Sequence, residues 1–303
     1  MENTRNIGMW LYTNSGGDKI GKDIIEKLKD RNIQTIDNIN LRKAIGKNGH
    51  ILYDKVKLDK LDLFFSYNAG EQSKYQTYLY QALNRAMPMI NSYEAFSLTE
   101  DKFQTSFVLR NNGIMTADYK LCHRGDEYQL KDTIKQWDKM VYKPIDGWGG
   151  IGLTKIENAE SLDMLIPFLN QMDLRYFYLE KFIKYDNTDF RIDIVDGQFV
   201  SCYGRKASGT DWRTNVTSGG SVFMREANQE IIDMSIKACE VCGVDIGGVD
   251  IIYDLEKEQY IVLEVNGIPA FATQEQEKMG LVFNEKKIDL IVDLIDRKTK
   301  KEG

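Results

Sequence analysis

Three residues with oxygen-bearing side chains lie close together near the end of the chain, in GGVDIIYDLEKEQYIVLEVNG. Asp250 lies on one predicted strand, and Glu264 and Asn266 lie on the next. Both strands are rich in Ile, Val and Tyr, and the polar turn between them predicts a hairpin. In register, the hairpin would gather these oxygens at one end of a buried sheet, where they suit Mg²⁺ completed by water and substrate phosphates. Acids that merely flank strand ends on a solvated face are the alternative.

A lysine followed by a glycine-rich turn offers chemistry suited to phosphate. Lys143 ends a predicted strand and is followed by PIDGWGGIGL. Glycines let backbone N–H groups approach phosphate oxygens closely, and a fixed lysine supplies a compact positive charge. The segment is neither a Walker A sequence nor a dinucleotide fingerprint. Glycine turns after strands are common, so this motif alone is a weak signal.

Two other segments have weaker local signals. Lys102 opens a predicted helix in TEDKF, where an isolated lysine is usually a surface residue. The segment YLEKF runs into an acidic turn that ends at Asp189. As an edge strand with an exposed backbone, followed by an acid, it could read adenine and ribose. An ordinary sheet edge explains the same residues equally well.

The segment GRKASGTDWRTNVTSGG gathers basic and polar residues. Arg205, Lys206 and Arg213 surround glycine-bearing loop residues and Asn215. Such a group could neutralise a transferring phosphoryl group or hold an acidic substrate. A solvated basic loop is the alternative interpretation.

The elements that must position these residues follow from the pattern of the whole chain. Strands and helices alternate over residues 7–90, which predicts a parallel sheet with crossovers and a first lobe that ends near Asn91. Two short helices follow and stop at Asn112-Gly113. Further strands are predicted at 117–122, 140–143, 175–183, 189–195 and 198–205, with helices at 128–137, 159–169, 227–242 and 286–297.

Composition narrows the functional classes. The chain has 303 residues, which is enough for two or three lobes, and its net charge of −6 does not favour nucleic acid as a partner. No apolar run reaches the length of a membrane span, and the N-terminus does not resemble a signal peptide, so we expect a cytoplasmic protein. Cys239 and Cys242 form a CxxC within a helical pattern, which suggests either buried packing or a zinc or redox site. The two histidines do not favour a histidine triad or a zinc hydrolase.

The order of the motifs resembles an ATP-grasp ligase of the RimK type, the alpha-L-glutamate ligase family. The segments that carry the resemblance are INSYEAFSLTEDK, VYKPIDGWGGIG, LEKFI, DFRIDIV, DWRTNVTSGG, GVDII and VLEVN. Together they span roughly residues 90 to 270. The implied fold is α/β (α+β), with an N-terminal parallel-sheet lobe at 1–92, a small central lobe at 93–182 and a C-terminal lobe with the metal site at 183–303.

The resemblance also implies roles for individual residues. ATP would be held by two phosphate-binding lysines, a glycine loop, an adenine-contacting hinge, a following acid and the Arg-x-Asn segment: Lys102, Lys143, Gly147, Gly149, Gly150, Gly152, Glu180, Lys181, Phe182, Asp189, Arg213, Thr214 and Asn215. Arg205 and Arg213 would act in catalysis, Arg205 by stabilising an acyl phosphate. Asp250, Glu264 and Asn266 would bind Mg²⁺, with two ions expected and Mn²⁺ as a substitute.

The implied reaction joins a small-molecule or peptide carboxylate to the amine of an amino acid, with glutamate as one candidate. ATP activates the carboxylate as an acyl phosphate, and ADP and phosphate are released. The alternatives are a biosynthetic peptide or amino-acid-carrier ligase that uses a different amine, and a non-catalytic ATP-binding scaffold. Many relatives carry Ser-Pro-Gly and an acidic stretch after the last motif, whereas this chain has GIPAFATQEQ. That difference bears on whether glutamate is the amino acid added. Relatives often form homo-oligomers, but no stripe in this sequence marks an interface.

Overall fold

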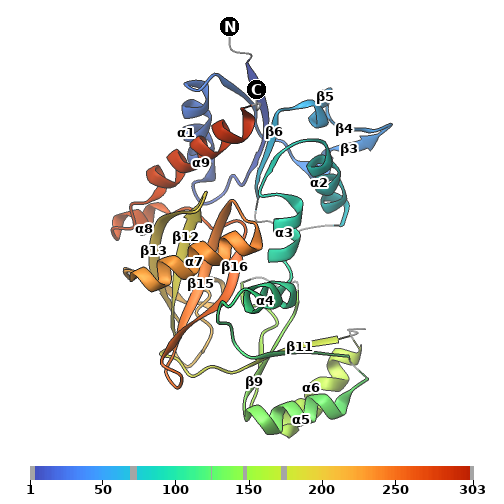
Figure 1. Ribbon diagram of the computed structural model, residues 1–303, viewed down its shortest axis with the longest axis vertical. Coiled ribbons are helices and arrows are strands. Elements are labelled where there is room, and N and C mark those ends of the chain that lie inside the picture. Colours follow the sequence, from blue (N-terminus) through green and yellow to red (C-terminus); the bar gives the residue numbers. More distant parts are fainter. Residues whose placement is uncertain (1–3, 69–73, 124, 146–148, 172–175, 301–303) are drawn as a thin grey trace.

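The structure is a computed structural model that describes residues 4–68, 74–123, 125–145, 149–171 and 176–300. Within these ranges the strands form four sheets. Figure 1 shows α1 (Gly17–Lys29) and α9 (Asn284–Thr299) together at one end of the molecule, and α5 (Glu127–Trp137) and α6 (Ala159–Gln171) at the other. None of the helices in the described ranges is both long and apolar enough to cross a bilayer.

The N-terminal sheet is parallel, as the alternating pattern predicted. Its strand order is β2-β1-β6-β7, formed by β1 (Arg5–Leu11), β2 (Ile33–Ile36), β6 (Leu63–Tyr67) and β7 (Met89–Ile90). Ile20, Ile24 and Leu28 are buried on one face of α1, which fits the helical repeat. The second helix of this region is α2 (Lys74–Ala86).

A small antiparallel sheet between η1 (Leu41–Lys43) and η2 (Leu58–Lys60) was not predicted. It consists of β3 (Ile45–Lys47), β4 (His50–Tyr53) and β5 (Val56–Lys57). All three residues of β3 are exposed. The strand therefore lacks the alternation of buried and exposed side chains by which a half-buried strand is recognised.

Two capped helices lead into the central region. The side chain of Ser92 accepts a hydrogen bond from Ala95 N–H at the start of α3 (Tyr93–Thr99), and Asp101 caps α4 (Lys102–Asn111) in the same way. Gly113 follows α4 with φ of 74°, the left-handed conformation that commonly ends a helix. These caps confirm the two predicted helices and their stop.

The central sheet is antiparallel, with the order β10-β9-β11-β8. Its strands are β8 (Tyr119–His123), β9 (Met140–Lys143), β10 (Thr154–Ile156) and β11 (Tyr176–Lys181). The expectation that YLEKF is an edge strand is wrong, because β11 pairs with β8 on one side and with β9 on the other. Leu130, Ile134, Leu162 and Ile166 from α5 and α6 are buried in the core beneath this sheet.

The C-terminal sheet has the order β14-β13-β12-β15-β16 and is antiparallel. It contains β12 (Thr188–Val195), β13 (Gln198–Lys206), β14 (Ser221–Phe223), β15 (Ile246–Asp254) and β16 (Gln259–Asn266). The remaining elements are η3 (Val216–Ser218), α7 (Gln229–Cys242) and α8 (Gln274–Lys278). Cys239 and Cys242 are buried in the core between α7 and this sheet, which confirms the packing interpretation. Burial raises the pKa of both thiols.

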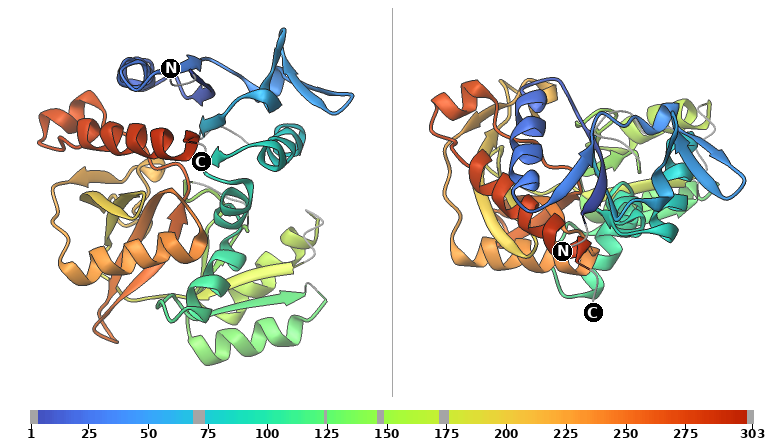
Figure 2. Two further views of the ribbon diagram at one scale, coloured as in Figure 1. Left: turned by 45° about the horizontal axis from the view of Figure 1, so that its top comes forward. Right: turned by 90° about the horizontal axis from the view of Figure 1, so that it is seen from above.

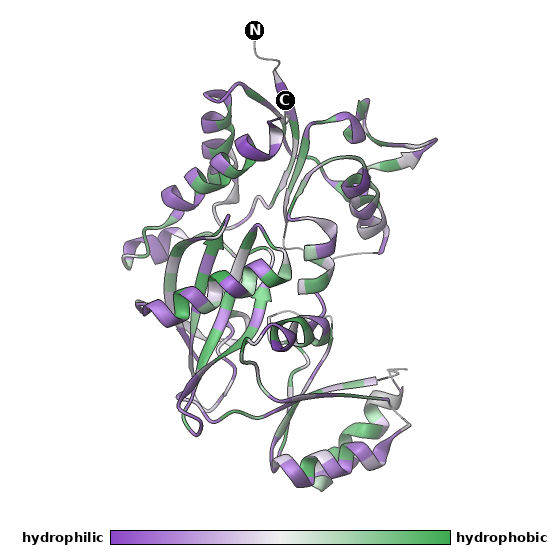
Figure 3. Ribbon diagram, in the orientation of Figure 1, coloured by the Kyte–Doolittle hydropathy of each residue, from purple (hydrophilic) through white to green (hydrophobic). Residues whose placement is uncertain are grey.

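Helix α9 packs against both the N-terminal sheet and the C-terminal sheet. Ile291 and Ile295 are buried in one core with Ile7 of the N-terminal sheet and with Val195 and Ile246 of the C-terminal sheet. The left view of Figure 2 shows α9 between these two regions, and Figure 3 shows alternating hydrophobic and hydrophilic residues along α1 and α9. The predicted division at residues 92 and 182 stays a prediction.

Candidate functional site

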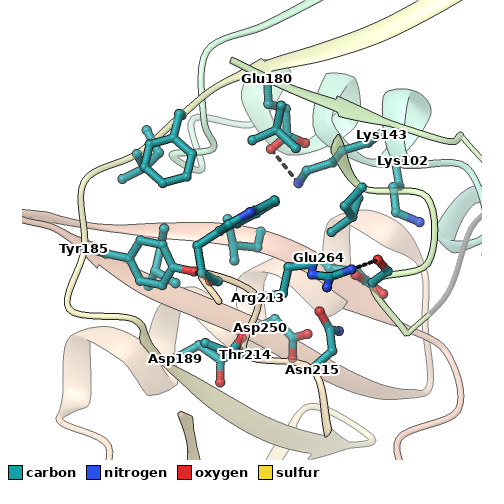
Figure 4. A pocket seen from close by; sticks show the side chains of 18 of the residues that line it. Lys102, Lys143, Glu180, Tyr185, Asp189, Arg213, Thr214, Asn215, Asp250 and Glu264 are labelled. Carbon is teal, nitrogen blue, oxygen red and sulfur yellow. Dashed lines mark hydrogen bonds and ion pairs between the residues drawn. The ribbon is translucent and has the colours of Figure 1, made fainter. Parts of the chain in front are cut away.

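A cavity between the central and C-terminal sheets gathers most of the residues that the sequence singled out. Its empty space, which includes space open to solvent, is about 820 Å³. Figure 4 shows Glu180, Lys143 and Lys102 on one wall, facing Asp189, Thr214, Asn215 and Asp250 on the other. The predicted residues that line it are Lys102, Lys143, Gly149, Gly150, Glu180, Lys181, Phe182, Asp189, Arg205, Arg213, Thr214, Asn215, Asp250 and Glu264.

Two described residues that were predicted for the site, Gly152 and Asn266, stand apart from this lining. Gly152 has φ of 77°, and a Cβ there would lie 2.7 Å from Pro144 Cγ, so this glycine permits close packing at the base of the loop. Asn266 is two residues beyond Glu264 on β16, at the edge of the lining. Gly147 lies outside the described residues.

Lys143 is held by an acid on the neighbouring strand. Lys143 pairs with Tyr178, and Val141 pairs with Glu180, so all four side chains share one face of the sheet. Lys143 Nζ lies 2.6 Å from Glu180 Oε2, and the Tyr178 hydroxyl donates to Glu180 Oε1 at 2.9 Å. The Lys143 side chain is only 11% exposed. This network fixes a positive charge at the wall of the cavity.

Lys102 reaches the same wall through a backbone contact. Its N–H donates to the carbonyl of Ile145 at 3.1 Å, which joins the first turn of α4 to the loop after β9. No local pattern in the sequence indicates this contact, because the two residues are far apart along the chain. The contact places the side chains of Lys102 and Lys143 beside each other, as Figure 4 shows.

At the end of β11 and just after it, fewer backbone N–H groups are available to a ligand than expected. Lys181 N–H donates to the carbonyl of Asp118 at 2.7 Å, and Phe182 N–H donates to the carbonyl of Lys139 at 3.0 Å. Both donors are therefore already used. The N–H of Ile183 has no hydrogen-bond acceptor among the described residues, and Ile183 lines the cavity.

Sequence reasoning missed the apolar and aromatic part of the lining. These residues are Val141, Ile151, Leu153, Ile183, Tyr185, Trp212, Ile252 and Leu263. Strand alternation could have found two of them, because Val141 and Ile252 are each two residues from a predicted site residue, Lys143 and Asp250. Together they form an apolar part of the lining, of the kind against which an aromatic ring can pack.

The glycine loop lies against the Arg213–Ser218 loop. The Gly149 carbonyl accepts a hydrogen bond from the Thr217 hydroxyl at 2.6 Å, and the Gly150 carbonyl accepts one from Arg213 Nη1 at 3.3 Å. A Cβ at Gly150 would lie 2.7 Å from Asn215 Oδ1, and its φ is 76°. Glycine is required there for both conformation and space.

A buried network of charges crosses the opposite wall. Asp189 is fully buried and accepts from Arg205 Nε at 3.0 Å, from Arg205 Nη2 at 2.6 Å and from the Thr214 hydroxyl. Arg205 Nη2 also lies 2.7 Å from Asp250 Oδ2. Arg205 is 7% exposed, so the interpretation of this residue as part of a solvated loop is wrong.

Arg191 completes the network and was not predicted. Its Nε donates to Asp250 Oδ1, and its Nη2 donates to Asp250 Oδ2 at 3.0 Å. Burial acts to raise the pKa of Asp250, but the guanidinium groups of Arg191 and Arg205 hold it below its usual value. Arg191 is two residues from Asp189 on β12, so alternation along the strand was the signal for its position.

The predicted hairpin forms, and two of the three proposed metal ligands meet across it. Asp250 and Glu264 are cross-strand partners on β15 and β16. The carboxylate of Glu264 has no hydrogen-bond or ion-pair partner among the described residues, whereas Asn266 Nδ2 donates to the Gly248 carbonyl at 3.1 Å. Two carboxylates and one amide, with room for water and phosphate, suit Mg²⁺. Within the described ranges no group of three or more His, Cys, Asp or Glu side chains is placed to hold a metal ion.

Comparison with known proteins identifies relatives of this chain. The sequence profile of the RimK-like ATP-grasp domain matches residues 99–291. A tetrahydromethanopterin:alpha-L-glutamate ligase from Methanocaldococcus jannaschii is 29% identical over 84% of this chain and 88% of its own. The alpha-aminoadipate–LysW ligase LysX of Saccharolobus solfataricus is 26% identical over 61% of this chain and 67% of its own.

Solved structures show the same fold. The ATP-grasp ligase PsnB, complexed with a minimal precursor, superposes with a TM-score of 0.69 at 16% identity and covers 96% of this chain and 99% of its own. The D-alanine–D-alanine ligase of Bacillus anthracis, complexed with ATP, gives a TM-score of 0.66 at 17% identity, with both chains fully covered. The expected ATP-grasp fold is thereby confirmed.

Proposed function

Because the chain belongs to the RimK-like ATP-grasp family and is an ADP-forming carbon–nitrogen ligase, we propose that it joins an amino acid to a carboxylate substrate through an acyl phosphate. Glutamate is one candidate for the amino acid. The observation that carries the proposal is the cavity between the two sheets. It is lined by three lysines, a glycine loop, two arginines and four acids, which could all act on one nucleotide.

The wall formed by the central sheet binds ATP in this proposal. Lys102, Lys143 and the N–H groups of the glycine loop contact the phosphates, while Glu180 holds Lys143 in place. The adenine ring lies among the apolar residues, with the N–H of Ile183 as a donor to the base. The two bound donors of Lys181 and Phe182 instead fix the shape of this segment.

In this proposal Asp189 positions Arg205 and Thr214. Both of its oxygens are engaged by Arg205 and Thr214, and the residue is fully buried. It therefore orients Arg205 toward the developing acyl phosphate and does not need to contact the ribose itself. Arg213, 3.3 Å from the Gly150 carbonyl, joins the glycine loop to the same wall. Positioning and charge neutralisation of this kind provide most of the catalysis in phosphoryl transfer.

Asp250, Glu264 and Asn266 hold Mg²⁺ in this proposal, and Glu264 is the residue most ready to do so. Its carboxylate has no partner among the described residues, so it can accept a cation without breaking an ion pair. Asp250 would share its oxygens between the ion and the two arginines. Bound Mg²⁺ neutralises charge on the β- and γ-phosphates.

The glycine loop and the Arg213–Ser218 loop exclude water from the reaction in this proposal. An acyl phosphate that met water would hydrolyse without forming an amide. The hydrogen bonds from Thr217 and Arg213 to the glycine loop hold the two loops together above the cavity.

The proposal is tested by measuring ADP release across a matrix of amino acids and carboxylates, with mass spectrometry of the products. We expect ADP to accumulate quickly only where an amine and a carboxylate are both present, together with a new amide. ADP release at the same rate in every combination, with no amide in any, would contradict the proposal.

A further inference from the structure

A fully buried lysine in the first turn of α9 contacts the chain that follows the metal-bearing hairpin. Lys287 Nζ donates to the carbonyl of Pro269 at 2.8 Å and to the carbonyl of Ala270 at 3.1 Å. Its third bond goes to Asp193 Oδ2 at 2.7 Å. An ammonium group has three N–H donors, so these bonds use all of them. Two of the three hold the segment 267–272, GIPAFA, which directly follows β16.

Other side chains hold the same segment. Asn284, three residues before Lys287, accepts from Ala272 N–H at 2.8 Å and donates through its Nδ2 to the Ala272 carbonyl at 2.9 Å. The Tyr67 hydroxyl, at the end of β6, donates to the Pro269 carbonyl. The segment is therefore fixed both by α9 and by the N-terminal sheet.

The ion pair with Asp193 does not by itself account for a lysine at this position. Asp193 is also fully buried, and its second oxygen, Oδ1, has no hydrogen-bond partner among the described residues. A buried ion pair with incomplete hydrogen bonding often stabilises a fold no more than apolar side chains of similar volume would. What Lys287 adds is therefore the fixed position of the two carbonyls that it binds.

The segment is coupled to the proposed metal ligand Asn266 through Gly248. Gly248 is the cross-strand partner of Asn266, and its carbonyl accepts a hydrogen bond from Asn266 Nδ2 at 3.1 Å. Pro269 packs against the same glycine, because a Cβ at Gly248 would lie 2.7 Å from Pro269 Cβ. A displaced Pro269 would therefore disturb Asn266 in two ways, directly along the chain and through Gly248.

We propose that Lys287 is a positioning residue for the Mg²⁺ site, which fixes the segment 267–272 and thereby the orientation of the Asn266 side chain. Lys287 does not contact the ion, because all of its donors are used and it carries a positive charge. The inference rests on the proposed function, since it takes Asn266 as a metal ligand. Replacing a residue that orients a metal ligand commonly lowers metal affinity by about 10–100-fold.

Two variants that both lack the ion pair separate positioning from charge balance. Asp193→Asn removes the acid's charge and leaves Lys287 on both carbonyls. The double variant Asp193→Asn/Lys287→Met has nearly the same side-chain volume but loses the bonds to the segment 267–272. Mn²⁺ is the metal probe, titrated into each full-length variant at saturating non-hydrolysable ATP analogue, with free Mn²⁺ measured by electron paramagnetic resonance. Urea unfolding gives the stability of each variant.

We expect Asp193→Asn to bind Mn²⁺ about as tightly as the unaltered protein, and the double variant to bind it about tenfold or more weakly. A purely structural role predicts that the two variants differ in stability alone. Equal Mn²⁺ affinities in the two variants would therefore overturn the proposal.

A variant without a buried charge provides a second test, which holds even if the double variant does not fold. Tyr67→Phe removes the other side-chain bond to the Pro269 carbonyl, so we expect Mn²⁺ affinity to fall severalfold. Tyr75→Phe is the matched control, because it removes a hydroxyl bond to the Ala44 carbonyl from a residue on α2, outside the lining of the ATP cavity. Equal Mn²⁺ affinities in Tyr67→Phe and Tyr75→Phe would also overturn the proposal.

The unaltered protein distinguishes this inference from the proposed function. If it binds Mn²⁺ together with the ATP analogue, equal affinities among the variants would count against Lys287 alone. If it binds neither, both the inference and the proposed function are overturned.

Discussion

Asp250 and Glu264 face each other across β15 and β16, yet their surroundings are opposite. Arg191 and Arg205 bind both oxygens of Asp250, while Glu264 has no partner among the described residues. A cation that entered between them would find one carboxylate already neutralised and one available. The two acids should therefore differ in what their removal does to stability and to activity.

Removing the charge of Glu264 should affect activity much more than stability. Glu264→Gln deletes the available carboxylate, so we expect turnover to fall more than tenfold and the Mg²⁺ concentration needed for half-maximal rate to rise. One lost charge-stabilising contact in such a site commonly costs roughly 2.7–4 kcal/mol. Turnover is measured against Mg²⁺ concentration, with the melting temperature as the control. Unchanged turnover would exclude Glu264 as a ligand.

Removing the charge of Asp250 should destabilise the fold as well. Asp250→Asn leaves Arg191 and Arg205 without one of their counter-charges in a buried place. Loss of one partner from a buried pair commonly costs about 3–5 kcal/mol. Urea unfolding of Asp250→Asn and Glu264→Gln, side by side, provides the measurement. Equal stability of the two variants would contradict the difference that we assign to their surroundings.

The glycine loop should not tolerate a side chain at Gly150. Gly150→Ala combines a positive φ with a Cβ 2.7 Å from Asn215 Oδ1, so it should displace the loop and raise the KM for ATP severalfold. Gly209→Ala is the matched control, because Gly209 has φ of 56° but no atom within 4 Å of a Cβ. Equal KM values for ATP in the two variants would mean that the approach of Gly150 to Asn215 does not affect ATP binding.

Acid should weaken the contact between the N-terminal strand and α9. Burial acts to raise the pKa of Asp296, but hydrogen bonds from Lys300 and Arg5 hold it below its usual value. A carboxyl whose pKa is lowered on folding stabilises the protein above its unfolded pKa, roughly 3.9, and this stabilisation is lost as the pH falls through the folded pKa.

Asp296→Asn should therefore lower the melting temperature at neutral pH, and its difference from the unaltered protein should shrink below about pH 4. Asp289→Asn removes an exposed ion pair with Lys27 and should change little at any pH. Melting curves from pH 3 to 7 give the comparison. A constant difference for Asp296→Asn across this range would contradict the assignment.

Features that depend on the local sequence pattern could be predicted from the sequence. The hairpin that carries Asp250 and Glu264 was predicted because alternation and a polar turn determine it locally. The interior position of β11 was not, because strand order depends on β8 and β9, which are distant along the chain. Strand alternation places Arg191 on the same face as Asp189, but it does not show which charge Arg191 meets there. Its importance appears only when Asp250 from β15 lies beside it.

The most direct test of the central claim follows oxygen from the carboxylate substrate. A carboxylate labelled with oxygen-18 is incubated with ATP, Mg²⁺ and the amine identified in the substrate matrix, and the released phosphate and nucleotide are analysed by mass spectrometry. An acyl phosphate requires one labelled oxygen to appear in inorganic phosphate, together with ADP. Label in AMP, or amide formed without label in phosphate, would contradict the account.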